Sequence, residues 1–574
     1  MQLSDYSLTA LFAYSLKKYD DAPFLSYVDG PVLTYRQFAR LLAALHRFFR
    51  EKGVRRGDRI LLLGQNQPRW GAAYFAAVTF GAVIVPVLTD FHPDEIMNIM
   101  QHSGARGIFI SEKMGKKMGD RIPASTWQVR LDDFKGAEGA AAPDPDTLPD
   151  FSPAELERLV EETEADDLAA IIYTSGTTGT PKGVMLTHRN IMSNVVSTSY
   201  IPVKMRPGNH LLSILPLAHT YECTIGFLTP MYLGAHIFYL RSLPAPSVLM
   251  PALEKVRPHV MLSVPLLMEK IYKNLVLPKV RDNQVLRRLY PAPLFRRLFH
   301  RLVGLKLRKI FGGRMLYFII GGASPSEEVE RFLREARFPL AKGYGLTETS
   351  PLVAGATAEY AKLYTIGPPI RGVQVRIDSS DPANVPGEIL VKGDNVFRGY
   401  FRDEEKTAAA FTPDGWFRTG DLGTLDADGY LSINGRLKNL ILGPSGENIY
   451  PESIEELLNE GDLVSESLVY EREGRLVARV HLDYDKLMEQ IRQLAGSAAD
   501  VPRIAGDYLA SLRKTVNSRL NVFSRISEIL EQKEPFEKTP TNKIKRYIYT
   551  ALQGRPEKGG DSRESLGNRD SRGR

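Results

Sequence analysis

Segment 173–183 combines hydroxyl side chains and glycines with one lysine, and it directly follows an apolar run, 168–173, that is typical of a buried strand. Glycines let backbone N–H groups approach a ligand closely, hydroxyls can donate hydrogen bonds, and Lys182 adds positive charge. This chemistry fits a polyphosphate. The spacing excludes a Walker A loop, and a flexible surface loop has no need of this composition. The candidate phosphate ligands are Thr174, Ser175, Gly176, Thr177, Thr178, Gly179 and Lys182.

A second motif, Gly-Tyr-Gly-Leu-Thr-Glu-Thr at 343–349, also carries phosphate chemistry. Gly343 and Gly345 permit a tight turn, and Thr347 can hydrogen-bond a phosphate. Glu348 offers a hard carboxylate oxygen for Mg²⁺. Taken alone, Glu348 is better interpreted as an acid at a helix start, stabilised by the helix dipole. The motif lacks the third glycine of a dinucleotide-binding fingerprint.

Two further segments could contact a nucleoside. Asp421 follows Arg-Thr-Gly, where its carboxylate can accept both hydroxyls of a ribose, although a turn-forming Asp with a local hydrogen bond is the simpler interpretation. Segment 321–324, Gly-Gly-Ala-Ser, follows the apolar run 316–320 and includes Gly322 and Ala323. A strand followed by such a turn brings backbone close to a planar ligand.

His219 and Glu222 superficially suggest a metal pair. The chain has one cysteine, Cys223, and no further ligand cluster, which argues against zinc. Cys223 also lacks the accompanying signature of a catalytic cysteine. A buried histidine with its hydrogen bonds satisfied is therefore a serious alternative for His219.

Taken together, these motifs resemble those of the adenylate-forming superfamily, which contains acyl-CoA synthetases, luciferases and the adenylation domains of peptide synthetases. The resemblance covers nearly the whole chain, and several spaced motifs in register are hard to obtain by chance. The matching segments, in the order that this family uses, are 173–183, 215–222, 321–324, 343–349, 416–421, 435–436 and Lys543.

The resemblance implies a role for each matching residue. Glu348 is the implied magnesium ligand, and Asp421 and Arg436 are implied to reach the ribose. Segment 321–324 corresponds to the loop on the adenine side, with Tyr344 as a stacking partner. His219, with Tyr221 nearby, is implied to line the acyl and CoA-facing side.

The last two motifs imply movement between domains. Lys438 corresponds to the hinge pivot, although a plain turn between domains also fits Gly435 and Arg436. Lys543 corresponds to the lysine that approaches the substrate carboxylate and the α-phosphate, with Lys545 as a decoy. This chain departs from the family pattern at two positions, with Asn542 where many members have Gly and Asn439 where an acid is usual.

The implied activity is ATP-dependent formation of an acyl-adenylate and transfer of the acyl group to coenzyme A, with Mg²⁺ as cofactor and acyl-CoA, AMP and pyrophosphate as products. Segments 215–222, 445–451 and 536–543 resemble the long-chain fatty acid branch, although none of them contacts the acyl tail directly. Two alternatives remain open: loading of an acyl carrier protein, and a non-catalytic scaffold. The scaffold alternative predicts loss of the phosphate segment, Glu348 or Lys543, all of which are present.

The elements that position these motifs are predicted to form an α/β fold. Apolar runs at 59–63, 83–87 and 106–110 alternate with helix-patterned stretches such as 35–52, which indicates layered α/β subdomains with parallel sheet. Segment 72–88 is interpreted as a helix running into a buried strand, and 136–153 as a surface loop that leads into the strand at 168–173. From residue 373, short strands between turn signals indicate a β-rich subdomain.

The domain prediction is a large N-terminal adenylation domain at 1–434, a hinge at 435–440 and a small mobile α+β domain at 441–552. Within the small domain, strands are predicted at 467–470 and 475–482, and a helix-patterned region at 504–530. The polar segment 553–574 cannot bury enough apolar surface to order itself and is predicted to be a disordered tail.

Composition favours a large globular protein, with 574 residues, 43% hydrophobic and 25% charged. One cysteine excludes an intrachain disulfide framework, and no signal pattern or uninterrupted apolar span of about 20 residues is found, so a cytoplasmic location is expected. Segment 273–314 carries 12 Lys or Arg and one acid, with Leu and Phe between the charges. It could contact anionic lipid at the inner membrane face or the CoA phosphates, or be a solvated helix; no motif supports a nucleic-acid partner.

Overall fold

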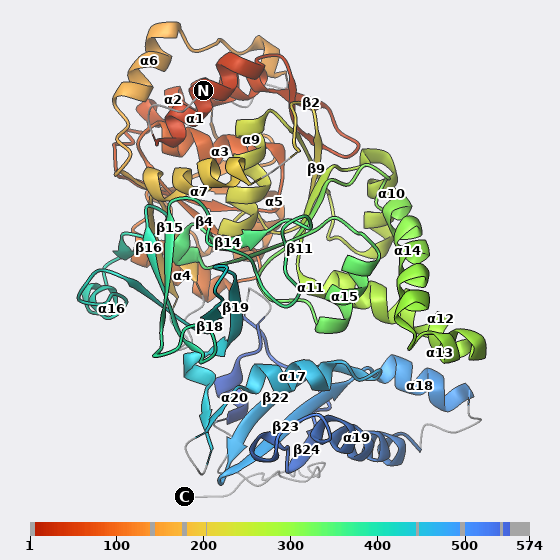
Figure 1. Cartoon of the computed structure of the whole chain (residues 1–574). Coiled ribbons are helices and arrows are strands. Elements are labelled where there is room, and N and C mark those ends of the chain that lie inside the picture. The colour runs from red at the N-terminus through yellow and green to blue at the C-terminus, as the bar shows by residue number, and fades with distance from the viewer. Residues whose placement is uncertain are drawn as a thin grey trace, which may run out of the picture. The chain divides into compact units, whose positions relative to one another are not determined.

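The computed structural model describes residues 6–137, 144–174, 181–201, 204–443, 447–493, 500–539 and 543–550 (Figure 1). The chain divides into two compact units. The first comprises Met1–Leu442 and Asn448–Asp462, and the second comprises Gly443–Glu447 and Leu463–Arg574. Within the described residues, every helix is too short or too polar to cross a membrane.

One sheet of the first unit has seven strands in the order β17-β8-β7-β4-β3-β5-β6. Its strands are β3 (Arg59–Leu63), β4 (Val83–Val87), β5 (Gly107–Ile110), β6 (Trp127–Arg130), β7 (Leu168–Thr174), β8 (Lys182–Thr187) and β17 (Gly399–Tyr400). Strands β3 to β7 run parallel, while β8 and β17 are antiparallel to their neighbours. The apolar runs of β3 and β4 are buried almost throughout, as expected for parallel strands covered on both faces.

A second sheet has eight strands in the order β14-β13-β12-β11-β9-β10-β1-β2. Its strands are β1 (Pro23–Tyr27), β2 (Val32–Thr34), β9 (His210–Ser213), β10 (His236–Tyr239), β11 (Val260–Ser263), β12 (Tyr317–Ile320), β13 (Leu340–Gly345) and β14 (Leu352–Ala356). The inner strands are parallel, and β2 and β14 pair antiparallel at the two edges. The predicted α/β class with parallel sheet is thus confirmed.

A third, antiparallel sheet follows in the chain, in the order β15-β16-β18-β19. Its strands are β15 (Val373–Asp378), β16 (Gly387–Gly393), β18 (Phe417–Leu425) and β19 (Leu431–Arg436). The turns between strands carry the predicted Gly signals, such as Gly415 and Gly429, both with positive φ. The β-rich subdomain is therefore confirmed.

The helices of the first unit are amphipathic or buried according to their sequence. They are α1 (Leu8–Tyr19), α2 (Tyr35–Glu51), α3 (Pro68–Thr79), α4 (Pro93–Ser103), α5 (Glu112–Met118), α6 (Pro153–Glu161), α7 (His188–Tyr200), α8 (Thr220–Cys223), α9 (Thr229–Leu233), α10 (Pro246–Val256), α11 (Pro265–Ile271), α12 (Leu277–Asp282), α13 (Gln284–Leu289), α14 (Pro293–Ile310), α15 (Glu327–Glu335), α16 (Glu404–Ala409) and α17 (Pro451–Asn459). Short 3₁₀ helices occur at η5 (Thr347–Thr349) and η6 (Leu437–Asn439), and a π-helical turn, η3 (Thr224–Leu228), links α8 to α9.

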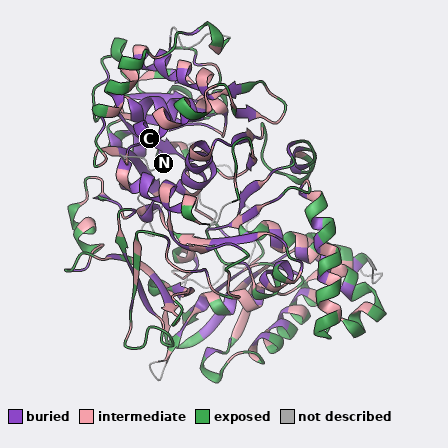
Figure 2. Cartoon of the chain, turned by 45° about the horizontal axis from the view of Figure 1, so that its top comes forward, coloured by how far each residue is buried: buried purple, intermediate pink, exposed green. Residues whose placement is uncertain are grey.

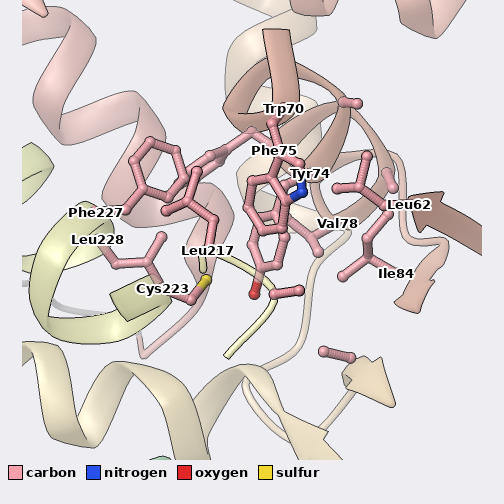
Figure 3. Close-up of a cluster of buried hydrophobic side chains, with 14 of the residues drawn as sticks. Leu62, Trp70, Tyr74, Phe75, Val78, Ile84, Leu217, Cys223, Phe227 and Leu228 are labelled. Carbon is pink, nitrogen blue, oxygen red and sulfur yellow. The ribbon is translucent and has the colours of Figure 1, made fainter. Parts of the chain in front are cut away.

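Helix α3 is buried along almost its whole length and runs into β4, as predicted for segment 72–88. Its Trp70 is fully buried. Figure 3 shows the surrounding cluster, whose labelled members are Leu62, Trp70, Tyr74, Phe75, Val78, Ile84, Leu217, Cys223, Phe227 and Leu228. This packing joins β3, β4, α3 and the segment that carries α8 and η3.

The prediction of a surface loop at 136–153 that leads into the strand at 168–173 omitted a helix. Helix α6 lies between them, because Ser152 and Glu155 form a capping box that starts a helix at Pro153. Before it, Pro145–Thr147 form a short 3₁₀ turn. Residues 138–143 lie outside the described part of the chain.

The second unit contains a three-stranded sheet, β22 (Val464–Arg472), β23 (Arg475–Leu482) and β24 (Glu528–Glu531), with α18 (Tyr484–Gln493), α19 (Val501–Asn517) and α20 (Arg546–Thr550). The predicted strands at 467–470 and 475–482 match β22 and β23. The helix predicted at 504–530 is wrong beyond Asn517, because the Asn517 side chain bonds the backbone N–H and C=O of Ile526 and folds the chain back into β24. The predicted tail, 553–574, lies outside the described residues.

Candidate functional site

The two ends of the hydroxyl-rich segment are held together by a β-hairpin. Thr174 ends β7 and Lys182 begins β8, and the two residues are paired in the antiparallel ladder. The sheet therefore places both at one edge of the first unit. The candidates Ser175, Gly176, Thr177, Thr178 and Gly179 lie outside the described residues.

Lys182 lies in a partly buried, mixed-charge environment. Its Nζ is 5.1 Å from the centroid of the Tyr400 ring, close enough for a cation–π contact. Burial lowers the pKa of Lys182, and the nearby Lys438 ammonium lowers it further, while Glu348 acts in the opposite direction. Lys182 and Glu348, which are far apart in the sequence, both contact Tyr400.

Glu348, in η5, is positioned by a residue that sequence reasoning missed. The Tyr400 hydroxyl donates a 3.0 Å hydrogen bond to Glu348 Oε1, and the Glu348 carbonyl accepts from the Phe397 amide at 2.8 Å. Burial raises the pKa of Tyr400 far above its usual value, so the hydroxyl remains a donor. Since Tyr400 pairs with Val184 of β8, the strand that carries Lys182 also positions Tyr400. The neighbouring Thr347 is buried.

Asp421 is held by one donor on each carboxylate oxygen. Arg436 Nε lies 2.9 Å from Oδ1, and the Tyr344 hydroxyl donates to Oδ2 at 2.9 Å. Asp421 and Arg436 are paired across β18 and β19, while Tyr344 comes from β13 of another sheet. Burial raises the pKa of Tyr344, which keeps its hydroxyl protonated. The structure therefore brings together three residues that the sequence motifs give separately.

The glycines around Tyr344 are required by close backbone packing. A Cβ on Gly345 would lie 1.7 Å from the carbonyl oxygen of Pro351, a severe clash with backbone. A Cβ on Gly343 would lie 2.8 Å from Leu352 Cδ1. The two glycines thus allow β13 and β14 to approach each other closely. Tyr344 lies between the two glycines in β13, so the same packing sets the position of its side chain.

The loop after β12 lies against Tyr221. A Cβ on Gly321 would be 2.9 Å from Tyr221 Cζ, and the Tyr221 hydroxyl donates to the Ile319 carbonyl at 3.0 Å. Gly322 has a φ of +85°, and both Gly322 and Ala323 are exposed. An open, side-chain-poor loop of this kind offers backbone to a flat ligand.

His219 caps helix α8 rather than pairing with Glu222. Its Nδ1 accepts from the Tyr221 amide at 3.3 Å, which places the ring beside Tyr221. Glu222 is fully buried, accepts from Ser213 Oγ at 2.6 Å, and burial raises its pKa to about 8. A carboxylic acid that is largely neutral near pH 7 is a poor metal ligand. In the described part of the chain, no group of three or more His, Cys, Asp or Glu could hold a metal ion.

The predicted hinge segment contains a contact that accounts for one departure from the family pattern. Asn439 Nδ2 donates to Glu452 Oε1 at 2.6 Å. An acid at position 439 would place like charges together, whereas the amide of Asn439 supplies a donor. Lys438, on the same 3₁₀ turn, is exposed.

Lys543 belongs to the second unit, where its backbone pairs with Thr539. The Thr539 amide donates to the Lys543 carbonyl at 2.8 Å, and the Lys543 amide donates to Thr539 Oγ1 at 3.2 Å. Buried Phe536 and Tyr549 anchor the segment against β22. Lys543 is exposed. Asn542 lies outside the described residues.

Comparison with known proteins gives a family and a fold. A family model described as AMP-binding enzyme matches residues 12–401. A long-chain-fatty-acid–CoA ligase, FadD15, of Mycobacterium bovis is 30% identical over 530 residues, with 86% of each chain covered. The peroxisomal long chain acyl-CoA synthetase 6 of Arabidopsis thaliana is 29% identical, covering 93% of this chain and 83% of that protein. The solved O-succinylbenzoate coenzyme A synthetase of Bacillus subtilis, in complex with ATP and magnesium ion, has a TM-score of 0.71 at 22% identity, over 93% of this chain and 98% of that one.

Proposed function

The chain belongs to the family of AMP-binding enzymes, the adenylate-forming superfamily, and on that premise we propose that it activates a long-chain fatty acid and transfers the acyl group to coenzyme A. The products are acyl-CoA, AMP and pyrophosphate. The observation that carries the proposal is a pair of carboxylates fixed by hydrogen bonds and an ion pair. Glu348 is held by Tyr400, whose ring also contacts Lys182, and Asp421 is held by Arg436 and by Tyr344 of the 343–349 motif.

Adenylation meets a general chemical need. A carboxylate resists nucleophiles because it is charged, and oxide is a very poor leaving group. The carboxylate therefore attacks the α-phosphate of ATP in line, and pyrophosphate leaves. The protein contributes mainly by positioning the reactants and by stabilising charge on the transferred phosphoryl group.

The donor set around Glu348 fits Mg²⁺. Tyr400 engages Oε1 of Glu348, and Oε2 accepts no hydrogen bond from the described residues. One protein carboxylate, completed by substrate phosphates and water, is a usual arrangement for Mg²⁺, which when bound neutralises phosphate charge. In this proposal Glu348 is the ligand, Tyr400 orients it, and the Thr347 hydroxyl contacts a phosphate.

The remaining nucleotide contacts are assigned by position and donor chemistry. Asp421, with Arg436 and Tyr344 holding its oxygens in place, accepts the ribose hydroxyls. Gly322, Ala323, Gly343 and Gly345 present backbone to the adenine, and the Tyr344 ring stacks on it. The phosphate chain is held by Lys182, Thr174 and the segment between them, Ser175, Gly176, Thr177, Thr178 and Gly179.

Lys543 is proposed to contact the substrate carboxylate and the α-phosphate during adenylation. For the second step, the small domain, 441–552, rotates about the hinge at 435–440, with Lys438 as the pivot and 1–434 as the fixed body. The rotation withdraws Lys543 and lets the thiol of coenzyme A attack the acyl-adenylate, so that AMP leaves. His219 and Tyr221 line the acyl and CoA-facing side.

The fatty acid as substrate is supported by the relatives, since two proteins that match most of this chain are named as long-chain acyl-CoA ligases or synthetases. Solved structures of the same fold are named for other acids, such as O-succinylbenzoate. Fold alone therefore does not select the acid.

The test is product analysis with purified protein, ATP, Mg²⁺ and carboxylic acids from short to long chain, each with CoA or with a phosphopantetheinylated acyl carrier protein. We expect acyl-CoA by mass spectrometry, with the highest rate for long-chain acids. Acyl-adenylate that only the carrier protein accepts would favour the carrier-loading alternative. No activation of any acid would refute the proposal and favour a non-catalytic scaffold.

A further inference from the structure

Helix α14 exposes a row of leucines on one face. Leu294, Leu298, Leu302 and Leu305 are 81%, 58%, 56% and 66% exposed. At 100° per residue, these four positions fall within an arc of about 80°. The opposite face, with His300, Gly304 and Leu307, is buried in the first unit. The outward leucines are therefore each more than half exposed, and Figure 2 shows exposed residues along the outer helices at the right edge.

Positive charge surrounds this row. Segment 284–310, which comprises α13 and α14, contains eight Lys or Arg and no Asp or Glu. Helical spacing puts Arg297, Arg301 and Arg308 along one side of the leucine row and Lys306 along the other. On α13, Val285 and Leu289 are 63% and 42% exposed, between further arginines. Exposed apolar side chains and cations thus occur together on both helices.

Beside α14, an arginine-lined hollow of about 300 Å³ opens toward α15. Its charged lining residues are Arg297, Arg301, Arg331, Arg334, Arg337 and Glu335. Glu335 already accepts from Arg296 at 2.9 Å and lies 2.7 Å from His300 Nδ1. The carboxylate is therefore engaged, and the hollow keeps a strong excess of positive charge suited to a phosphate group.

We propose that the outer face of α13 and α14, with the arginine-lined hollow, docks this protein on the surface of an anionic phospholipid membrane. The leucine row enters the boundary between headgroups and acyl chains, the flanking cations contact lipid phosphates, and the hollow receives one headgroup. Charge complementarity selects this partner: cations flank the apolar row on both sides and no acid interrupts them. A nucleic acid would leave the leucines without a partner. The proposal stands independently of the reaction.

The test is sedimentation of the full chain with phosphatidylcholine vesicles and with vesicles that also contain phosphatidylglycerol. We expect binding to the anionic vesicles alone, weakened by salt. The triple variant Leu294→Gln, Leu298→Gln, Leu305→Gln should lower the partition coefficient by about tenfold or more. The matched control Leu243→Gln, at a residue that is 80% exposed but outside α13 and α14, should bind as the native chain does.

The hollow is tested by the double variant Arg297→Gln, Arg301→Gln. It should reduce the preference for phosphatidylglycerol by at least about fivefold while leaving the leucines in place. No binding of the native chain to anionic vesicles, equal binding to neutral ones, or unchanged binding of the triple variant would overturn the proposal. A dimer in solution that the triple variant abolishes, without vesicle binding, would also overturn it in favour of a second copy.

A labelling experiment reports insertion directly. Cys223 is buried, and burial raises its pKa to about 12, so it reacts poorly and a new surface cysteine can be labelled selectively. An environment-sensitive fluorophore on Leu298→Cys should shift to shorter wavelength with anionic vesicles, whereas Leu243→Cys should not shift. An unshifted label at position 298 would contradict insertion of the leucine row.

Discussion

Two regions of the first unit differ in whether their charged side chains are held by other groups of the chain. At the proposed nucleotide site, Glu348 and Asp421 are each held by donors from other elements of the chain. On the outer face of α13 and α14, Arg287, Arg288 and Lys306 form no ion pair within the described residues. Fixed side chains suit a small ligand that must be held in one geometry, whereas cations without an ion pair in the described residues, beside exposed leucines, suit an extended charged surface.

The largest effect that separates the two regions is expected for Glu348→Gln. The amide keeps the size of the side chain but removes the charge that would hold Mg²⁺ and phosphate, so acid-dependent pyrophosphate release should fall by about a hundredfold or more. The control Glu359→Gln alters an exposed acid that pairs with Lys204, and it should leave the rate unchanged. If the Glu348→Gln variant kept a rate within a few-fold of the native rate, the assignment of Glu348 to the site would be wrong.

A somewhat smaller effect is expected for Asp421→Asn. The variant weakens the charge-assisted contact with Arg436 and the acceptor for the ribose, so kcat/KM for ATP should fall by about ten- to a hundredfold. Steady-state kinetics at a fixed acid concentration measures this. Asp428→Asn is the matched control, because Asp428 lies in the turn of the same hairpin and pairs with Lys362. Equal behaviour of the two variants would contradict the ribose assignment.

Tyr400→Phe should cost about tenfold in kcat, because it removes one hydroxyl that orients Glu348 and leaves the ring over Lys182. Its signature is the magnesium dependence: the concentration for half-maximal rate should rise, and excess Mg²⁺ should restore part of the activity. Tyr430→Phe, which removes a hydroxyl bonded to the Tyr360 carbonyl, serves as control. An unchanged magnesium dependence would mean that Tyr400 contributes packing and does not orient Glu348.

The smallest effect is expected on the outer face. Leu298→Gln should change the free energy of unfolding by less than about 0.5 kcal/mol, since the residue is more than half exposed. By contrast, Trp70→Ala in the cluster of Figure 3 should cost about 3 to 5 kcal/mol. Urea denaturation measures both values. A loss above about 1 kcal/mol for Leu298→Gln would mean that the chain itself covers this face.

The sequence predicted those features that depend on local pattern. Apolar runs located β3, β4 and β12, and the turn signals indicated the β-rich subdomain that contains β15, β16, β18 and β19. Local pattern fails where a side-chain contact across a turn decides, as where Asn517 binds the backbone of Ile526 and α19 ends ahead of the predicted end at residue 530. The missed helix α6 is a different case, because Ser152 and Glu155 form a capping box that is visible in the sequence.

For the candidate site, too, the sequence predicted single residues but not the contacts between them. The motifs pointed to Glu348, Asp421, Tyr344 and Arg436 one by one, but their contacts join strands of separate sheets that no spacing in the sequence reveals. Tyr400 carries no motif of its own, and only the pairing of β17 with β8 brings it to Glu348. The contact between Asn439 and Glu452 shows how a departure from the family pattern is accommodated.

The proposed activity requires reversible formation of an acyl-adenylate, and isotope exchange between pyrophosphate and ATP measures that step without coenzyme A. Purified protein should incorporate labelled pyrophosphate into ATP when a long-chain fatty acid and Mg²⁺ are present. We expect no incorporation when the acid is left out, and none with the Glu348→Gln variant. Exchange that does not depend on the acid, or no exchange with any carboxylic acid, would contradict the formation of an acyl-adenylate.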